Sequence, residues 1–113
     1  MSRVLLVDDD ETSIQILKII LEDEGFEVDL ALTGSKAVEK ASTGGYQVIL
    51  LDYKLPDMRG RDVAAKIRGA GLRPKIVLLT GYTTDEDLYD KVLMKPVPPV
   101  EILEAIRETL KAR

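Results

Sequence analysis

The sequence contains no cysteine and no histidine among its 113 residues. Without these side chains the chain cannot form disulfides or zinc sites with thiolate and imidazole ligands, and it has neither a Cys nucleophile nor a His general base. Any metal site must therefore be built from oxygen ligands, and any chemistry must come from carboxylates, hydroxyls and amines.

Long hydrophobic runs are missing as well, since the longest have four or five residues and a bilayer span needs roughly 20. The start, MSRVLLVDDD, lacks the layout of a signal peptide because acidic residues follow almost at once. The net charge of −4 argues against non-specific binding to nucleic acid, which needs an excess of basic residues. We therefore expect a cytoplasmic protein that contacts neither a membrane nor nucleic acid directly.

Short apolar runs rich in β-branched residues predict buried strands of a parallel sheet. They lie at residues 4–7, 48–51, 76–79 and 92–94. A fifth segment alternates Val28, Leu30 and Leu32 with less apolar neighbours, which is typical of an edge strand with one buried face.

Apolar residues at helical spacing lie between these strands, at 14–21, 37–41, 63–67 and 103–110. Thr12 or Ser35 are candidates to cap helix starts, and Gly60 falls where a chain reversal is expected. The alternation predicts an α/β fold: a flavodoxin-like, doubly wound sheet of five parallel strands in the order 2-1-3-4-5, with helices on both faces. We expect residues 1–113 to form one domain.

Polar residues follow four of the predicted strands directly. Asp8, Asp9 and Asp10 come after the first, Asp52 after the third, Thr80 after the fourth and Lys95 after the fifth. In a parallel sheet these positions share one edge, where ligands bind at the switch point of the strand order. Carboxylates that converge there repel one another unless a cation intervenes, and Mg²⁺ suits a set of oxygen ligands.

The arrangement favours phosphoryl chemistry. Asp9 and Asp52 would bind the metal directly, while the Lys95 ammonium and the Thr80 hydroxyl would bind phosphoryl oxygens. Asp52, at the end of the central strand, is best placed to act as the nucleophile and to form an acyl phosphate.

Four motifs in order, VLLVDDDE, VILLDYKLPDMRG, LLTG and MKP, resemble the receiver domain of two-component response regulators over essentially the whole chain. The resemblance implies that Asp52 is phosphorylated, that Asp8 binds Mg²⁺ through water, and that the Lys54 backbone carbonyl completes the ligands. It also implies a cis bond between Lys95 and Pro96.

By the same resemblance the chain is a phosphorylation-dependent signalling switch. The expected phosphoryl donor is the phosphohistidine of a sensor histidine kinase or a phosphotransfer protein, and a phosphorelay intermediate or the receiver of a hybrid kinase remains open. The chain would be a phosphoacceptor that promotes phosphorylation and dephosphorylation of its own Asp52, rather than an enzyme in the usual sense. No GxxxxGK[ST] loop for nucleotide is present.

Other interpretations of the same residues exist. The acidic run could simply cap the following helix. The pattern Asp8-x-Asp10-x-Thr12 fits the nucleophile motif of haloacid-dehalogenase-type phosphatases, which would make Asp8 the phosphorylated residue, although the later acidic pair of those enzymes is missing. A third hypothesis is a pseudo-receiver, a binding module that works without phosphorylation.

The chain departs from the family between Thr80 and Lys95, where only fourteen residues intervene. The family's fourth helix can then have at most about two turns, or be replaced by a loop. This puts in doubt dimerisation through the face formed by the family's fourth helix, fifth strand and fifth helix. Val92 occupies the position of the family's switching aromatic residue, so we expect that coupling to be absent or rerouted through Tyr82 or Tyr89.

Overall fold

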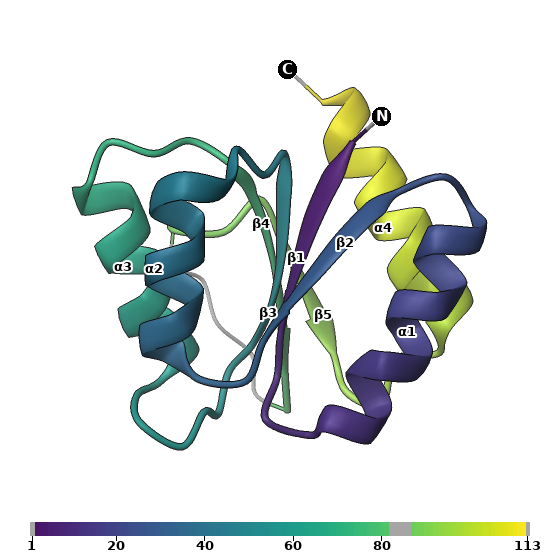
Figure 1. The fold of residues 1–113 in the computed structure, drawn as a ribbon, viewed down its shortest axis with the longest axis horizontal. Helices are drawn as coiled ribbons and strands as arrows, with labels where there is room; N and C mark the ends of the chain where they lie inside the picture. The colour runs from purple at the N-terminus through teal and green to yellow at the C-terminus, as the bar shows by residue number, and fades with distance from the viewer. Residues whose placement is uncertain (1, 82–86, 113) are drawn as a thin grey trace.

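The computed structural model describes residues 2–81 and 87–112. Five parallel strands form one sheet in the order β2-β1-β3-β4-β5, which confirms the predicted topology and places β2 at an edge (Figure 1). The strands are β1 Arg3–Val7, β2 Glu27–Ala31, β3 Val48–Asp52, β4 Lys75–Thr80 and β5 Lys91–Met94. The helices are α1 Glu11–Asp23, α2 Gly34–Gly44, α3 Gly60–Gly69 and α4 Pro99–Lys111.

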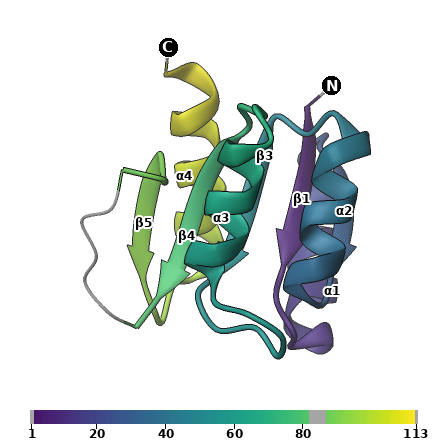
Figure 2. The ribbon, with the colours of Figure 1, turned by 90° about the vertical axis from the view of Figure 1, so that its left-hand side faces the viewer.

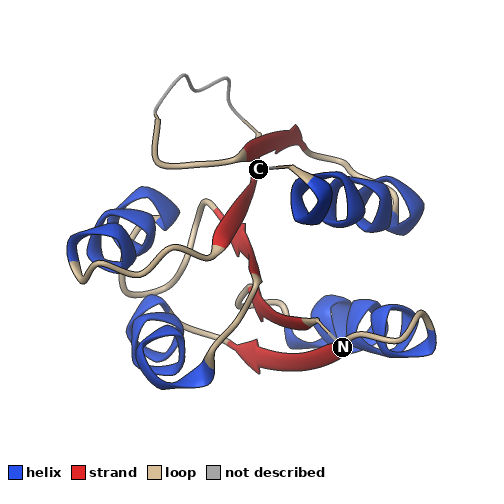
Figure 3. Cartoon of the chain, turned by 90° about the horizontal axis from the view of Figure 1, so that it is seen from above, coloured by secondary structure: helices blue, strands red, loops and turns tan. Residues whose placement is uncertain are grey.

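Helices cover both faces of the sheet (Figure 3), with α1 and α4 on one side and α2 and α3 on the other, as labelled in Figure 1. Successive strand residues point to opposite faces, so β1 supplies Val4 and Leu6 to the core beneath α1 and α4. Its Leu5 and Val7 enter the core beneath α2 and α3. Each fully buried side chain of this size contributes roughly 1.5–3 kcal/mol, which explains why the inner strands are almost wholly apolar.

The helices begin at residues other than the predicted caps. Asp10 caps α1, accepting hydrogen bonds from the Ser13 N–H at 3.3 Å and the Ser13 hydroxyl at 2.8 Å. Thr33 caps α2 by accepting the Lys36 N–H at 3.1 Å. Thr12 and Ser35 lie inside the helices, so the prediction for them was wrong, because a cap must precede the first helical residue.

No helix is found among the residues described between β4 and β5, which are Gly81 and 87–90. The strand β5 lies at the edge of the sheet next to β4 (Figure 2), and the described part of the crossover is in keeping with the predicted short or missing fourth helix. Residues 82–86, on which part of that prediction falls, lie outside the described residues. The helix named α4 here therefore occupies the place of the family's fifth helix.

The loop that follows β3 is anchored to the start of α2 by Asp57. Its carboxylate accepts the N–H groups of Gly34 and Ser35 at 2.8 and 2.9 Å, and also the Ser35 hydroxyl at 2.9 Å. These bonds satisfy donors that every helix leaves free in its first turn. The sequence offered little sign of this contact, because Asp57 lies 23 residues from Gly34 along the chain.

We expect Asp57→Ala to lower the free energy of unfolding in a pH-dependent way. The Gly34 and Ser35 N–H groups hold the pKa of Asp57 below its ordinary 3.8. The carboxylate therefore stabilises the fold above that value, and the contribution is lost as the pH falls through the folded-state pKa. Urea unfolding of both proteins from neutral to acidic pH measures the difference. Ser35→Ala, which removes only the hydroxyl donor, should have a smaller effect, and a wild-type advantage that persists undiminished at low pH would contradict the account.

Candidate functional site

The structure brings three carboxylates together at the carboxyl edge of the sheet. Oxygens of Asp8, Asp9 and Asp52 all lie within 4.8 Å of one another. The proximity follows from the fold, because β1 and β3 are neighbours with Val7 paired to Leu51, and Asp8 and Asp52 come next. Asp52 is 5% exposed, Asp8 is partly buried and Asp9 is exposed.

The acidic run after β1 serves two purposes. Asp8 is held in place by its N–H, which donates to the Ala31 carbonyl at 3.1 Å, and by its carboxylate, which accepts the Asp10 N–H at 2.9 Å. Asp10 instead turns toward α1, where the hydroxyl and N–H of Ser13 lower its pKa. The helix-cap interpretation is thus correct for Asp10, whereas Asp8 and Asp9 belong to the carboxylate cluster.

Burial raises the pKa of Asp8, and the nearby charge of Asp52 acts in the same direction. The hydrogen bond from the Asp10 N–H and the charge of Lys95 oppose this shift without cancelling it. Three carboxylates so close together are therefore poorly compensated by the protein alone, which is typical of a site that binds a cation.

Lys95, directly after β5, forms an ion pair with Asp52. Its own N–H donates to the Thr80 carbonyl at 2.8 Å, and the Lys95–Pro96 bond is cis, as predicted. Burial tends to lower the pKa of Lys95, but the hydrogen bond and charge of Asp52, with those of Asp8 and Asp9, outweigh it and raise that pKa. The ammonium therefore stays charged at neutral pH.

Two open hollows meet at Asp52 and Lys95. The first, of about 620 Å³, is lined by the acidic run together with Pro96 and Val97. The second, of about 310 Å³, is lined by Tyr53, Lys54, Thr80 and Gly81, so Thr80, 1% exposed, and Lys54 lie where the sequence placed them. Roles for the Thr80 hydroxyl and the Lys54 carbonyl remain predictions.

The chemistry of the cluster fits Mg²⁺. Its donors are all carboxylate oxygens, and they come from residues that share one edge and one opening. Mg²⁺ prefers oxygen ligands, and usually one or two carboxylates with the remaining positions filled by water or phosphate. The thiolate and imidazole ligands that would favour zinc or copper are absent from the sequence.

Comparison with known proteins agrees with this geometry. The family model of the response regulator receiver domain matches residues 4–107 of the sequence. This chain belongs to that family. Among solved structures, the receiver is similar to a CheY-like response regulator receiver domain protein from Methanospirillum hungatei, at 35% identity and a TM-score of 0.85, with 97% of this chain and 94% of that chain covered.

A second similar structure is the response regulator TrrA from Thermotoga maritima in complex with Mg²⁺ and BeF, at 33% identity and a TM-score of 0.86, with 96% of this chain and 99% of that chain covered. The curated relatives include the transcriptional regulatory protein DltR of Streptococcus agalactiae, 35% identical over 115 residues. That match covers 93% of the receiver and 50% of DltR. The receiver thus spans about half the length of this relative.

The family membership sets the phosphatase hypothesis aside. The geometry gives an independent reason, because Asp10, the second acid of the DxDxT pattern, is engaged as the cap of α1.

No helix among residues 2–81 and 87–112 is both long and apolar enough to cross a bilayer. Tyr82, one of the two proposed carriers of a rerouted switch, lies outside the described residues, whereas Tyr89 and Val92 pack against the core beneath α2 and α3.

Gly60 lies where the reversed loop after β3 closes, next to the antiparallel bridge between Lys54 and Arg59, and it also begins α3. The glycine is buried, and a Cβ there would lie 2.7 Å from the Asp52 carbonyl oxygen. Its N–H donates to the Tyr53 carbonyl at 2.6 Å. Gly60 therefore lets α3 pack directly against the end of β3, and only the folded chain reveals that close approach.

We expect Asp8→Asn to make the metal-free receiver more stable and to weaken its response to Mg²⁺. The folded-state pKa of Asp8 lies above its ordinary 3.8, so its ionisation begins to cost stability as the pH rises above 3.8; the cost is complete above the folded-state pKa and vanishes at lower pH. Asparagine keeps the acceptor for the Asp10 N–H but removes the charge. For the wild type, Mg²⁺ at ten times its Kd should add about 1.4 kcal/mol of stability.

Urea unfolding with and without MgCl₂, against NaCl of matched ionic strength, measures both effects. A metal-free Asp8→Asn protein that unfolds more easily than the wild type would contradict the first expectation. An unchanged Mg²⁺ response would contradict the second.

Proposed function

We propose that this receiver is a signalling switch that accepts a phosphoryl group onto Asp52 from the phosphohistidine of a sensor histidine kinase or phosphotransfer protein. The observation that carries the proposal is the position of the Asp52 carboxylate, nearly buried, ion-paired with Lys95 and within 4.8 Å of Asp8 and Asp9. A lysine placed among three clustered acids in an open hollow is typical of a functional site, and these groups suit phosphoryl and metal binding.

In the proposed mechanism an Asp52 oxygen attacks phosphorus, and the bond between phosphorus and the histidine nitrogen breaks. The nitrogen keeps the electron pair, and the free imidazole leaves. The Lys95 ammonium and the Thr80 hydroxyl bind the phosphoryl oxygens and stabilise the charge that builds up there. Attack by water on the phosphorus then breaks the bond to the Asp52 oxygen, which restores the carboxylate and releases inorganic phosphate, so the receiver also promotes its own dephosphorylation.

Asp8, Asp9, Asp52 and the Lys54 carbonyl would hold Mg²⁺, with Asp8 acting through water. When bound, Mg²⁺ supplies the positive charge that lets an anionic phosphoryl group approach three carboxylates. Lys54 lines the hollow that opens beside Asp52, and we infer that it helps to set the lifetime of the phosphorylated state.

The experiment that tests the proposal is chemical trapping of the phosphorylated residue. The receiver is treated with acetyl phosphate and Mg²⁺, and borohydride then reduces the acyl phosphate to a homoserine that peptide mass spectrometry locates. A label on Asp52 supports the proposal, and a label on Asp8 would overturn it in favour of phosphatase-like chemistry. No label, together with no spectral response to Mg²⁺ and beryllofluoride, would establish a pseudo-receiver.

We infer that the protein donor docks on the outer surface of α1. Ile16 and Ile19 are 54% and 67% exposed there, although most large apolar side chains of the described chain are buried. An apolar groove of about 290 Å³ runs beside Ile16 between α1 and the start of α4, and Asp8 and Ser13 line both this groove and the acidic hollow. A partner seated on this groove would have its phosphohistidine near Asp52.

We expect Ile16→Ser to slow transfer from a phosphorylated kinase or phosphotransfer protein by about five- to thirtyfold, the range for loss of a well-packed interface residue. Phosphorylation by acetyl phosphate should be unchanged, because the small donor needs no docking surface. Lys66→Ser, on the exposed side of α3, serves as a control that should alter neither rate. Equal loss with both donors would argue against docking on α1.

The cellular location and the output of the receiver are also part of the proposal. DltR is a transcriptional regulatory protein about twice the length of the matched region, and we infer that the receiver acts in the cytoplasm through an output partner or segment, without contacting nucleic acid itself. The short crossover favours an output surface other than the face of β5 and α4 through which the family commonly dimerises.

A further inference from the structure

Lys95 follows directly on β5, the outermost strand at one edge of the sheet. That strand has four residues and pairs with β4 alone among the described strands. A short edge strand frays easily, because few hydrogen bonds and little buried surface oppose its opening. Since no helix lies among Gly81 and 87–90, the start of β5 needs another anchor if Lys95 is to stay opposite Asp52.

Asp90, the residue before β5, is bound twice to the backbone of Ile76 in β4. Its N–H donates to the Ile76 carbonyl at 2.8 Å, and its carboxylate accepts the Ile76 N–H at 2.7 Å. The register pairs Val77 with Lys91, so Ile76 and Asp90 form the next pair outward. The Asp90 carboxylate thus replaces a backbone carbonyl and closes the ladder where β5 begins.

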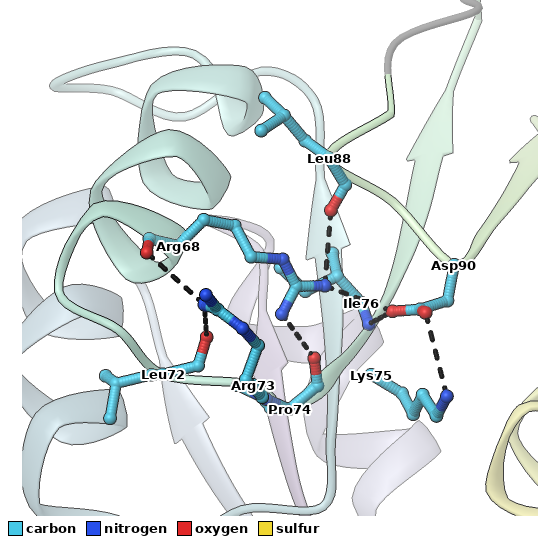
Figure 4. Close-up of polar contacts among 8 residues, drawn as sticks. All are labelled: Arg68, Leu72, Arg73, Pro74, Lys75, Ile76, Leu88 and Asp90. Atoms are coloured by element: carbon cyan, nitrogen blue, oxygen red, sulfur yellow. Dashed lines mark hydrogen bonds and ion pairs between the residues drawn. The ribbon is translucent and has the colours of Figure 1, made fainter. Parts of the chain in front are cut away.

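Arg68, close to the end of α3, holds Asp90 from the other side (Figure 4). Its guanidinium donates to the Asp90 carboxylate at 3.1 Å and to the carbonyls of Pro74 and Leu88 at 2.7 and 3.3 Å. A rigid planar group with several donors can bind such a set at one time. The Arg68 side chain therefore joins α3, the start of β4 and the segment that leads into β5.

A second ion pair on β5 provides a comparison. Lys91 binds Glu108 of α4 at 2.6 Å, but these side chains are 36% and 64% exposed. Arg68 and Asp90 are 22% and 30% exposed, and only Asp90 adds bonds to the backbone of the neighbouring strand. Exposed pairs contribute little because water competes for both charges, so the Arg68–Asp90 clamp is the stronger anchor.

We propose that Arg68 and Asp90 are positioning residues for Lys95, taking over the task of a full-length helix in the crossover. The clamp sets the register of β5 at one end, and the bond from the Lys95 N–H to the Thr80 carbonyl ends the same ladder at the other. Release of Asp90 lets the strand fray and displaces the ammonium from Asp52. The inference rests on the proposed function, in which that ammonium meets the phosphoryl group.

The test is a pair of NMR titrations, one with Mg²⁺ alone and one with beryllofluoride in saturating Mg²⁺, the latter mimicking the phosphoryl group. Asp90→Ala should weaken beryllofluoride binding about five- to tenfold, in the range of couplings between linked residues. Its Mg²⁺ affinity should stay unchanged, because the acidic ligands lie on the loop after β1 and at the end of β3. Hydrogen exchange at the Lys95 amide should become faster.

Three further variants sharpen the test. Glu108→Ala, which removes the exposed pair from the same strand, should leave both affinities unchanged. Arg68→Gln keeps a long polar side chain and serves if Asp90→Ala fails to fold; it should also weaken beryllofluoride binding. In a Lys95→Met background, Asp90→Ala should cause no further loss, because the clamp acts through Lys95.

These measurements distinguish failure of the positioning role from failure of the proposed function. Equal losses of Mg²⁺ and beryllofluoride affinity would show general damage and would overturn the positioning role, as would unchanged beryllofluoride binding in Asp90→Ala. If the wild type itself binds no beryllofluoride, the proposed function fails. The exchange rate of the Lys95 amide then still decides whether the clamp holds β5.

Discussion

Asp52→Asn should yield a receiver that carries no detectable acyl phosphate after treatment with acetyl phosphate and Mg²⁺, a loss of at least about a thousandfold in the rate of phosphorylation. An amide nitrogen or oxygen is a far weaker nucleophile than a carboxylate. The variant also removes one of the three clustered carboxylates, so its Mg²⁺ affinity should fall. Phosphate incorporation and an NMR titration with Mg²⁺ measure the two effects.

Asp10→Asn is the matched control, because it removes the same charge from a residue only two positions from Asp8. Asparagine caps helices as well as aspartate does, so the contacts with Ser13 at the start of α1 can be retained. This variant should be phosphorylated at close to the wild-type rate. A similar loss in both variants would mean that net charge, and not the Asp52 nucleophile, governs the reaction.

Gly60→Ala should destabilise the receiver by about 1–3 kcal/mol, the usual cost of forcing an extra group into a packed interior. The added Cβ would lie 2.7 Å from the Asp52 carbonyl oxygen, 3.1 Å from the Tyr53 Cα and 3.2 Å from Leu78. Two of these three neighbours are backbone atoms, which cannot swing aside as a flexible side chain would. Urea unfolding measures the loss.

Gly69→Ala offers a control in the same helix. A Cβ at Gly69 meets nothing within 4 Å, so the substitution should stabilise α3 by about 0.5–1 kcal/mol, the ordinary advantage of alanine over glycine in a helix. Gly60→Ala should also slow phosphorylation, because relief of the clash shifts the backbone of Asp52. Equal stability changes at the two glycines would refute the packing explanation.

Most of the fold could be predicted from the sequence. A strand buried on both faces, such as 48–51, is recognisable by its uninterrupted apolar residues. The β2 segment is recognisable by its alternation of more and less apolar residues, because burial on one face leaves a different pattern from burial on both. The first residues of the helices were harder to predict from the sequence. Thr12 and Ser35 are good caps by residue type, but the choice of Asp10 and Thr33 depends on where each strand ends and on which side chain then reaches the first turn.

The candidate site was predictable because the fold rule and the residue types point the same way. Parallel strands end at one edge, so Asp8, Asp52, Thr80 and Lys95, each the last residue of a strand or the residue directly after it, had to share that edge. Which of the three aspartates after β1 caps α1 and which join the carboxylate cluster was not predictable. Three consecutive aspartates look alike in sequence, and only the turn after β1 directs Asp10 to the helix while Asp8 stays with Asp52.

By itself, then, the sequence determined the chemistry of this receiver, because the absence of cysteine and histidine left oxygen ligands and one well-placed lysine, and the strand periodicity put them on one edge. Only the tertiary structure decided how that edge is supported. The clash that Gly60 avoids and the Arg68 clamp on Asp90 join residues far apart in the chain. Such contacts form or fail when the spacing between packed elements changes by a few tenths of an ångström, and the pattern of residue types along the chain does not specify that spacing.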